Sequence, residues 1–323
     1  MQRLNLVVIN RSANGDHLSV LDRLKDLANI TIGNTVDELS GPARNADVVL
    51  NGMNRGEQLR TLWPQLQKIR WVHSLSAGVE NTLFPELIES PIPLTNARGV
   101  FAPALGEFAI GAVFFFAKDF RRMVRNQAAH KWEQFLVDMV QGKVLGVVGY
   151  GEIGRAAAER GHAMGMKVAA LRRRPERSKV DPIVDQNFPP DQLHDLLGIS
   201  DYVVVATPLT RETRGMIGEK ELRAMKRSAV IINVGRGPVI EEAPLICALK
   251  ENWIRGAALD VFDEEPLPEK HPFWDMENVL LSPHCADQTK TWLHEATEFF
   301  VQNFERFARG EELLNVVDKR AGY

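Results

Sequence analysis

The chain has 323 residues, of which 45% are hydrophobic and 25% are charged, a composition typical of a soluble globular protein of about two domains. Its 24 glycines and 17 prolines are close to average usage, which excludes a collagen-like or low-complexity chain. The 39 Lys and Arg residues nearly balance the 42 Asp and Glu residues, for a formal net charge of −3. Such a chain lacks the global positive field that holds a nucleic-acid backbone, so we expect no nucleic-acid partner.

Cysteine usage indicates a reducing compartment, and the distribution of apolar residues bears on membrane binding. The two cysteines, Cys247 and Cys285, are too few for a disulfide framework, and their spacing fits no zinc pattern, so we expect no metal. The longest apolar run, residues 109–117, is too short to span a bilayer, and the first residues lack the pattern of a signal peptide. We therefore expect a cytoplasmic protein that does not bind membranes.

Short apolar segments alternate with helical stretches along the chain, which is typical of parallel sheets with crossover helices. In the N-terminal part the predicted strands are residues 6–9, 48–51 and 71–75, with amphipathic stretches such as 16–27 between them. A second series of nearly continuous apolar segments indicates strands covered on both faces. This series comprises residues 144–149, 168–171, 202–206, 229–234, 257–261 and 279–281.

Two longer helical stretches are predicted as well. Residues 104–127 form one long stretch with a largely apolar first half, which could connect two domains or contact another subunit. Residues 289–308 repeat apolar side chains at helical spacing, and Gly310 stands where a C-terminal capping glycine would.

The strongest local signal is the G-x-G-x-x-G pattern of Gly149, Gly151 and Gly154. The pattern follows an apolar strand and opens an alanine-rich helix, and a second strand follows, which is the context that dinucleotide binding requires. Gly149 would make the tight turn, Gly151 would let the backbone approach a pyrophosphate, and Gly154 would let helix and strand pack closely. The phosphates would bind at the positive end of the helix. The alternative is a glycine turn in an ordinary βαβ unit.

The residues after the second strand bear on the choice of dinucleotide. NAD-binding proteins usually place Asp or Glu there to bind the ribose hydroxyls, whereas this chain has Arg172, Arg173 and Arg174. Guanidinium groups bind a 2′-phosphate, so Arg172 and Arg173 predict NADP as the preferred cofactor, with NAD as the second option. The alternative is a solvated basic turn.

Three later segments, each ending a predicted strand, carry Arg236, Glu265 and His284. Ligands of doubly wound sheets gather at strand ends, and these side chains suit reduction of a 2-oxo acid. A protonated imidazole can give its proton to the carbonyl oxygen when a hydride reaches the carbonyl carbon. A guanidinium can bind the carboxylate, and a carboxylate next to the imidazole favours its protonated form and fixes its tautomer.

At these residues the chain resembles the D-isomer-specific 2-hydroxyacid dehydrogenase family over essentially its full length. The resemblance rests on residues 149–154, 201–208 with Thr213, 234–237, 258–267 and 282–289. It implies that Arg236 and Glu265 are catalytic and that His284 is the acid/base residue. It also implies substrate contacts from the backbone of Ser76, Ala77 and Gly78, and from Arg236.

The resemblance and the glycine pattern together predict a set of cofactor contacts. Asp260 is implied to lie near the nicotinamide amide, and Thr207 and Pro208 to border the cofactor. The full set is Gly149, Gly151, Glu152, Ile153, Gly154, Arg172, Arg173, Thr207, Pro208, Thr213, Val234, Gly235, Arg236, Asp260 and His284.

The implied fold is α/β, with two doubly wound parallel-sheet domains. A flavodoxin-like substrate-binding domain would comprise residues 1–98 and 288–323, and an inserted Rossmann dinucleotide-binding domain residues 99–287. The implied enzyme is an NAD(P)-dependent oxidoreductase that transfers a hydride between NADP(H) and a small 2-oxo acid or D-2-hydroxy acid, with glyoxylate or hydroxypyruvate preferred. A homodimer is expected, in which Trp132 could lend its side chain to the partner.

Other readings of the chain remain. The main alternative is a dinucleotide-sensing corepressor of the same family, which would bind the cofactor without turning over 2-oxo acids. A short-chain reductase would need a Tyr-x-x-x-Lys pair, and none of Tyr150, Tyr202 and Tyr323 has Lys four residues later. His73 lies inside an apolar strand and is interpreted as a core residue, and Cys285 as incidental.

Overall fold

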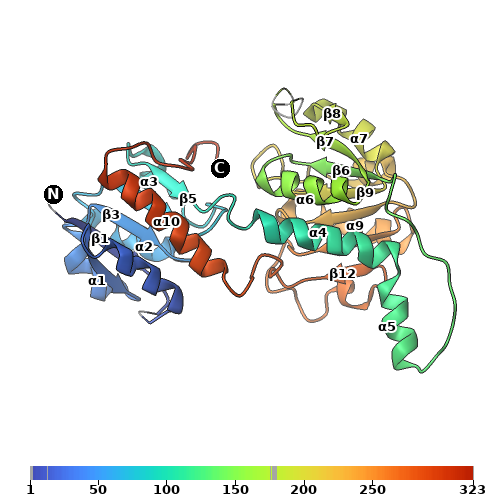
Figure 1. Cartoon of the computed structure of the whole chain (residues 1–323), viewed down its shortest axis with the longest axis horizontal. Coiled ribbons are helices and arrows are strands. Elements are labelled where there is room, and N and C mark those ends of the chain that lie inside the picture. The colour runs from blue at the N-terminus through green and yellow to red at the C-terminus, as the bar shows by residue number, and fades with distance from the viewer. Residues whose placement is uncertain (1–2, 13, 175, 177–179, 323) are drawn as a thin grey trace. The chain divides into compact units, whose positions relative to one another are not determined.

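The computed structural model describes residues 3–12, 14–174, 176 and 180–322. The chain folds into two compact units: unit 1 comprises Met1–Phe101 and Thr289–Tyr323, and unit 2 comprises Ala102–Gln288. Each unit contains a parallel sheet with helices on both faces (Figure 1), which confirms the predicted α/β class with two doubly wound sheets. Within the described ranges, no helix has the length and apolar character that crossing a membrane requires.

Unit 1 contains a five-stranded sheet in the order β2-β1-β3-β4-β5, which is the flavodoxin-like order. The strands are β1 (Leu4–Ile9), β2 (Ala28–Gly33), β3 (Val48–Asn51), β4 (Trp71–Ser74) and β5 (Leu94–Asn96). The helices are α1 (Val36–Ala43), α2 (Gly56–Leu62), α3 (Pro85–Glu89) and α10 (Trp292–Ala308), with 3-10 helices η1 (Asp16–Leu24) and η2 (Trp63–Gln65).

Alternate side chains of β4 pack on opposite faces of this sheet, as strand geometry requires. Trp71 stacks on Phe300 of α10 with ring centroids 5.3 Å apart, whereas Val72 packs with residues of α1 and α2. His73 shares the Trp71 face, is fully buried, and its Nδ1 lies 2.6 Å from the Thr95 hydroxyl. Burial lowers the pKa of His73 to about 3, so the ring is neutral at physiological pH. The prediction of a core histidine is confirmed.

Unit 2 contains a seven-stranded sheet in the order β12-β11-β10-β9-β6-β7-β8. The strands are β6 (Val144–Val148), β7 (Lys167–Leu171), β8 (Gln186–Phe188), β9 (Tyr202–Val205), β10 (Val230–Asn233), β11 (Gly256–Leu259) and β12 (Val279–Leu281). The helices are α4 (Ala102–Ala117), α5 (Phe120–Ala128), α6 (Glu152–Ala163), α7 (Leu193–Ile199), α8 (Glu219–Ala224) and α9 (Glu242–Lys250). The 3-10 helices are η4 (Pro190–Gln192), η5 (Gly237–Val239) and η6 (Pro272–Asp275).

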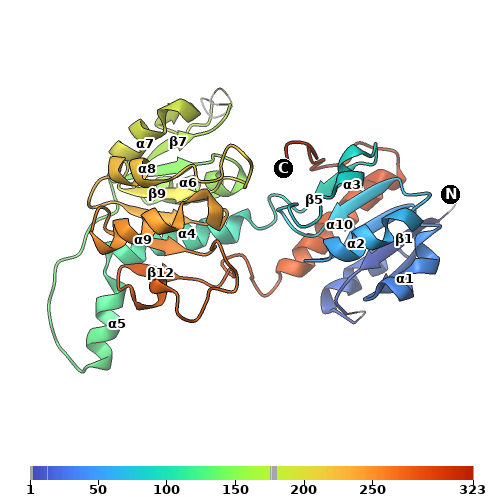
Figure 2. The same cartoon turned by 180° about the vertical axis from the view of Figure 1, so that it is seen from behind.

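Counted from β6, this order is that of a Rossmann sheet with one further strand. β7 and β8 are added on one side of β6 and β9 to β12 on the other, so the strand order reverses between β6 and β9. Helices α4 and α6 cover one face, and α7, α8 and α9 cover the other (Figures 1 and 2). Leu196 of α7 and Leu249 of α9 belong to the apolar core on that second face. Because every strand runs in the same direction, all carboxyl ends lie at one edge of the sheet.

The strands that the sequence pattern does not predict are β2, β5 and β8, which lie at sheet edges. β2 and β8 are partly exposed and lack a continuous apolar run, and β5 has only three residues. The other predicted strands are present with small shifts of their ends.

The prediction of one long helix over residues 104–127 is wrong. α4 ends at Ala117 and α5 begins at Phe120, because Asp119 between them has a φ of 51°, a left-handed conformation that ends a helix. The Asp119 carboxylate then accepts a hydrogen bond from the backbone N–H of Arg122 and caps α5. At the end of α10, Gly310 has a φ of 74° and its N–H bonds to the Phe307 carbonyl, as predicted for a capping glycine.

Candidate active site

The glycine turn after β6 has two positions where only glycine fits. Gly149 has a φ of 98°, and a Cβ there would lie 2.8 Å from the carbonyl oxygen of Ala206. A Cβ on Gly154 would lie 2.3 Å from the carbonyl oxygen of Gly149. At Gly151, by contrast, a Cβ would meet no protein atom within 4 Å. Packing within the chain therefore does not require glycine at position 151, whereas a ligand that approached the backbone closely would require it.

Groups around this turn fit a dinucleotide. Gly151 is the N-cap of α6 and offers no side-chain cap, so N–H groups of the first turn, at Glu152 and Ile153, point to solvent or a ligand. Next to Gly149 lies Thr207, whose hydroxyl oxygen is buried and has no hydrogen-bond partner in the described part of the chain. The helix end suits phosphate oxygens, and a bound polar molecule would satisfy the threonine hydroxyl.

The arginines predicted to bind the 2′-phosphate directly follow β7. Arg172 is half-buried and its backbone N–H bonds to the Phe188 carbonyl at 3.4 Å, whereas Arg173 is exposed. Hydrogen bonds from the Thr210 side chain and from the backbone lower the pKa of the Glu212 carboxyl group, and the nearby Arg211 and Arg173 lower it further. The arginines therefore lie at the carboxyl edge of the sheet, one strand away from the glycine turn.

The residues after β9 that are predicted to border the cofactor, Thr207, Pro208 and Thr213, belong to a turn held by hydrogen bonds. The Thr213 hydroxyl donates to the Pro208 carbonyl at 2.6 Å and accepts from the Thr210 N–H at 2.8 Å. These bonds hold residues 208–213 together directly after Thr207.

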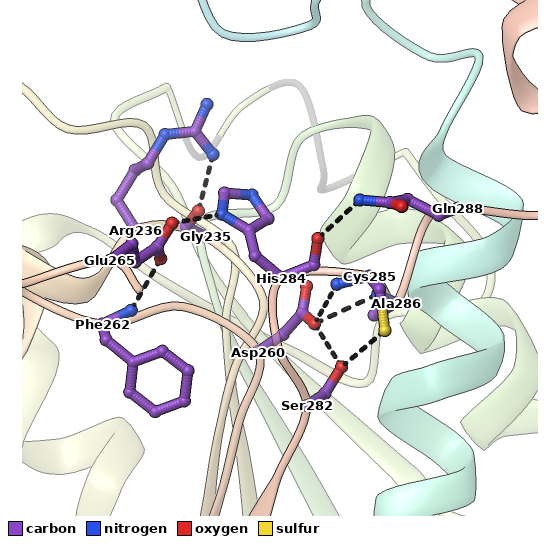
Figure 3. Close-up of polar contacts among 10 residues, drawn as sticks. All are labelled: Gly235, Arg236, Asp260, Phe262, Glu265, Ser282, His284, Cys285, Ala286 and Gln288. Carbon is purple, nitrogen blue, oxygen red and sulfur yellow. Dashed lines mark hydrogen bonds and ion pairs between the residues drawn. The ribbon is translucent and has the colours of Figure 1, made fainter. Parts of the chain in front are cut away.

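Arg236 follows β10 in a turn that Asn233 holds. The Asn233 amide donates to the Arg236 carbonyl and accepts from the Gly235 N–H, both at 3.1 Å. The Arg236 guanidinium donates to the Gly235 carbonyl at 2.8 Å, while Val234 is buried. The backbone around Arg236 is thus fixed, and its charged group reaches beyond the strand end (Figure 3).

Glu265 and His284 form a hydrogen-bonded pair. Nδ1 of His284 lies 2.7 Å from Oε2 of Glu265, and Oε1 of Glu265 accepts from the Phe262 N–H at 2.9 Å (Figure 3). Because a carboxylate only accepts, Nδ1 carries the hydrogen, and Nε2 remains for a reacting molecule. The side chains are 43% and 36% exposed, so the pair is accessible.

The turn that carries His284 is held by a buried carboxylate. Oδ1 of Asp260 accepts hydrogen bonds from the Ser282 hydroxyl and from the N–H groups of Cys285 and Ala286, at 2.5, 3.0 and 3.1 Å. His284 itself has a φ of 51°, which is unfavourable for a side-chain residue and needs such support. Burial raises the pKa of Asp260, against the effect of these hydrogen bonds and the nearby His284. Asp260 therefore holds the backbone directly after the histidine and the Ser282 side chain before it.

The structure brings Arg236, Glu265 and His284 together at the carboxyl edge of the unit 2 sheet. The predicted substrate residues Ser76, Ala77 and Gly78 lie in unit 1, in the loop after β4, and are half-buried. The Ser76 hydroxyl donates to the sulfur of Met53.

Sequence reasoning assigned no role to Asn233, Ser282 or Asp287. Asn233 and Ser282 lie inside the motifs that carry Arg236 and His284. Their positions at the ends of predicted strands are the sequence signal that could have identified them as site residues. Burial raises the pKa of Asp287, and His284 and Arg236 act electrostatically on its carboxyl group in the opposite direction. Trp132 is 96% exposed, and Trp292 packs on Phe101 within unit 1.

Comparisons with known proteins agree with this geometry. Residues 110–286 match the family model described as D-isomer specific 2-hydroxyacid dehydrogenase, NAD binding domain. Curated relatives include a glyoxylate reductase of Korarchaeum cryptofilum, 35% identical over 261 residues that cover 78% of this chain and 77% of the relative. A glyoxylate reductase of Thermococcus litoralis is 36% identical over 266 residues, 78% of each chain. A solved D-isomer specific 2-hydroxyacid dehydrogenase from Xanthobacter autotrophicus, in complex with NADPH and MES, is 31% identical with a TM-score of 0.85 and full coverage of both chains.

Replacing Gly151 with alanine tests whether the open space there holds a cofactor. We expect Gly151→Ala to weaken NADPH and NADH binding about tenfold or more, because the methyl group would occupy the path of the pyrophosphate. Loss of the glycine N-cap should lower Tm by no more than about 4 °C. Gly154→Ala is the matched variant, and its Cβ contact of 2.3 Å should destabilise unit 2. Fluorescence titration and thermal melting give both quantities, and unchanged affinity in Gly151→Ala would contradict the assignment.

Proposed function

We propose that this chain, which belongs to the D-isomer specific 2-hydroxyacid dehydrogenase family, transfers a hydride between NADP(H) and a small 2-oxo acid or D-2-hydroxy acid. The observation that carries the proposal is the His284–Glu265 pair beside Arg236, at the edge of a sheet whose glycine turn fits a dinucleotide. Unit 2 is then the dinucleotide-binding domain, and unit 1 the substrate-binding domain.

The proposed roles follow from the chemistry of each side chain. A dinucleotide held at the glycine turn would supply the hydride for the carbonyl carbon. Nε2 of His284 gives its proton to the carbonyl oxygen, and Glu265 stabilises the imidazolium and holds its ring. The Arg236 guanidinium can bind the substrate carboxylate with two parallel hydrogen bonds. Backbone N–H groups of Ser76, Ala77 and Gly78 are proposed as further ligands of that carboxylate.

For the substrate we propose glyoxylate or hydroxypyruvate. The curated relatives reported above are named glyoxylate reductases, and they cover more than three quarters of this chain. The proposed cofactor preference for NADP rests on Arg172 and Arg173, and the related Xanthobacter autotrophicus structure contains NADPH. The cytoplasmic location stays a prediction.

The first test is reduction of a panel of small 2-oxo acids with each cofactor. We expect turnover of glyoxylate or hydroxypyruvate, with kcat/KM for NADPH above that for NADH by at least about tenfold at low ionic strength, because one charge-assisted hydrogen bond has this effect. Arg172→Asp should shrink or invert the ratio by repelling the 2′-phosphate. Arg227→Asp, an exposed position before the amino end of β10, should leave it unchanged.

Two results of this assay would contradict the proposal. Equal kcat/KM values for the two cofactors, or a higher value for NADH, would mean that Arg172 and Arg173 only form a solvated basic turn. Tight cofactor binding without turnover across the panel would favour the dinucleotide-sensing alternative.

Glu265→Gln tests the proton-donor pair. The amide cannot stabilise the imidazolium as the carboxylate does, because it carries no charge. We expect kcat for 2-oxo acid reduction to fall about tenfold or more in Glu265→Gln, the size of one charge-assisted hydrogen bond. Glu264→Gln removes the same charge from the neighbouring exposed residue and should leave kcat unchanged. Equal kcat values in Glu265→Gln and the parent would rule out the pairing.

We also propose a homodimer formed through an arm, defined as residues 119–139. Figure 1 shows α5 and the following residues standing away from the sheet of unit 2, and the N–H of Asp138 returns to the Ala117 carbonyl. The arm carries seven exposed apolar side chains: Phe120, Met123, Val124, Trp132, Leu136, Val137 and Met139. Exposed apolar surface of this kind marks an association site, and a second copy of the chain carries the same surface for two-fold pairing.

Changing Trp132 and Leu136, which are 96% and 99% exposed, tests the dimer. Light scattering should give the parent a mass of about twice 36.2 kDa. The double variant Trp132→Ser with Leu136→Ser should be monomeric at the same concentration, because its interface loses two apolar anchors. Met164→Ser, at an exposed apolar position at the end of α6, should remain dimeric. A monomeric parent would refute the proposal.

A further inference from the structure

The loop after β4, residues 76–78, carries two backbone N–H groups that are available to a ligand. The N–H groups of Ala77 and Gly78 donate to no acceptor in the part of the chain that the structure describes, although both residues are half-buried. The N–H group of Ser76 differs, because it donates to the hydroxyl oxygen of Ser74 at 3.3 Å. Buried N–H groups normally have a partner, so those of Ala77 and Gly78 are suited to a bound acceptor such as a carboxylate.

The carbonyl groups of the same loop are held from within unit 1. Asn96, the last residue of β5, donates from its side-chain amide to the Ala77 carbonyl at 2.5 Å. The backbone N–H of Ala97 donates to the Ser76 carbonyl at 3.2 Å. In a planar trans peptide unit the carbonyl and the N–H point in opposite directions. The bond from Asn96 to the Ala77 carbonyl therefore also sets the direction of the Gly78 N–H, which belongs to the same peptide unit.

Asn96 is itself fixed by its neighbours. It is 3% exposed and pairs with Ser74 in the register of β4 and β5, and its Oδ1 accepts from the Arg98 N–H at 3.4 Å. The C-terminal segment adds a second support, because the Asn315 amide donates to the carbonyls of Asn96 and Arg98 at 3.3 and 2.7 Å. A buried amide that is bonded through both its nitrogen and its oxygen keeps one orientation, so the peptide unit that it holds keeps one orientation as well.

We propose that Asn96 is a positioning residue for the substrate carboxylate: its amide orients the peptide unit between Ala77 and Gly78 so that the Gly78 N–H is directed at the bound carboxylate. This inference rests on the proposed function, in which the loop of residues 76–78 binds that carboxylate. A donor that is oriented before the ligand arrives loses little conformational freedom on binding, which raises the affinity. The role of Asn96 is indirect, since its own amide is bonded to Ala77 and Arg98.

The test measures substrate and cofactor binding separately in Asn96→Ala and Asn96→Asp. Both variants remove the donor to the Ala77 carbonyl; the alanine adds no charge and the aspartate leaves no cavity, so a shift common to both reports the lost hydrogen bond. A carboxylate that does not react is bound equally in the ground and transition states. KM for glyoxylate or hydroxypyruvate should therefore rise about tenfold, while kcat changes less than about twofold. The inhibition constant of oxamate, an unreactive analogue with the same carboxylate, should rise by a similar factor.

Three controls separate positioning from loss of structure. The Kd of NADPH without substrate should stay within about twofold of the parent in both variants, because the proposed cofactor site lies in unit 2. Asn5→Ala removes an amide that donates to the Asn45 carbonyl at 3.0 Å, near the amino end of β1 at the opposite edge of the unit 1 sheet, and should leave KM unchanged. Thermal melting gives the folded fraction, and a variant that merely unfolds in part loses apparent kcat at constant KM, because fewer molecules are active.

Three outcomes would overturn the inference. If the parent reduces no 2-oxo acid, the proposed function fails, and the inference fails with it. If the parent is active and both Asn96 variants keep its KM and its inhibition constant for oxamate, the function stands and Asn96 has no part in carboxylate binding. If the Kd of NADPH rises as much as KM does, the effect is not specific to the carboxylate and Asn96 has only a structural role.

Discussion

The common direction of the strands in unit 2 decides where its chemistry can take place. A parallel sheet collects all of its carboxyl ends at one edge, so the turns after β6, β9, β10 and β12 become neighbours although the chain separates them widely. Gly149, Thr207, Arg236 and His284 each follow one of these strands. A slip of register in any strand would displace its turn from the others, so the burial of the strands on both faces also maintains the alignment of the site.

Buried polar groups hold the turns that carry Arg236 and His284 in place, whereas the strand ends only bring these turns close together. Asp260 is 1% exposed, and a carboxyl group at that depth is costly unless donors surround it. The donors come from the turn around His284, so the same hydrogen bonds offset the cost of burying Asp260 and support the unfavourable φ of the histidine. Asn233 acts similarly for Arg236, with a neutral amide in place of a carboxylate. The reacting side of the site stays exposed, and the supporting side is rigid.

The local sequence pattern predicted the central strands of both sheets better than the edge strands. The central strands have continuous apolar runs because both faces are covered, and each of them was predictable from its own residues. Edge strands such as β2 lack that signal, and their pairing depends on a neighbour elsewhere in the chain. The break at Asp119 depends on one backbone angle, which apolar periodicity does not report.

The same distinction applies to the site. Residues that directly follow a strand, such as Arg236 and His284, were predictable because the strand and the motif adjoin in sequence. The contact of Asn96 with Ala77 joins residues 19 positions apart, and no local pattern encodes it. Ser282 and Asn233 stood within recognised motifs, but only the hydrogen bonds show what they do.

The insertion of unit 2 into unit 1 has a consequence for the order of folding. The chain leaves unit 1 at Phe101 and returns at Thr289, and α10, which lies after that return, supplies Phe300 and Phe304 to the core around Trp71. During synthesis, unit 2 is complete before α10 exists, so it can fold as the ribosome continues. Until then, the apolar residues of unit 1 around Trp71 lack the cover that α10 provides. Unit 1 therefore exposes apolar surface for longer during synthesis than unit 2 and is the more aggregation-prone part of the growing chain.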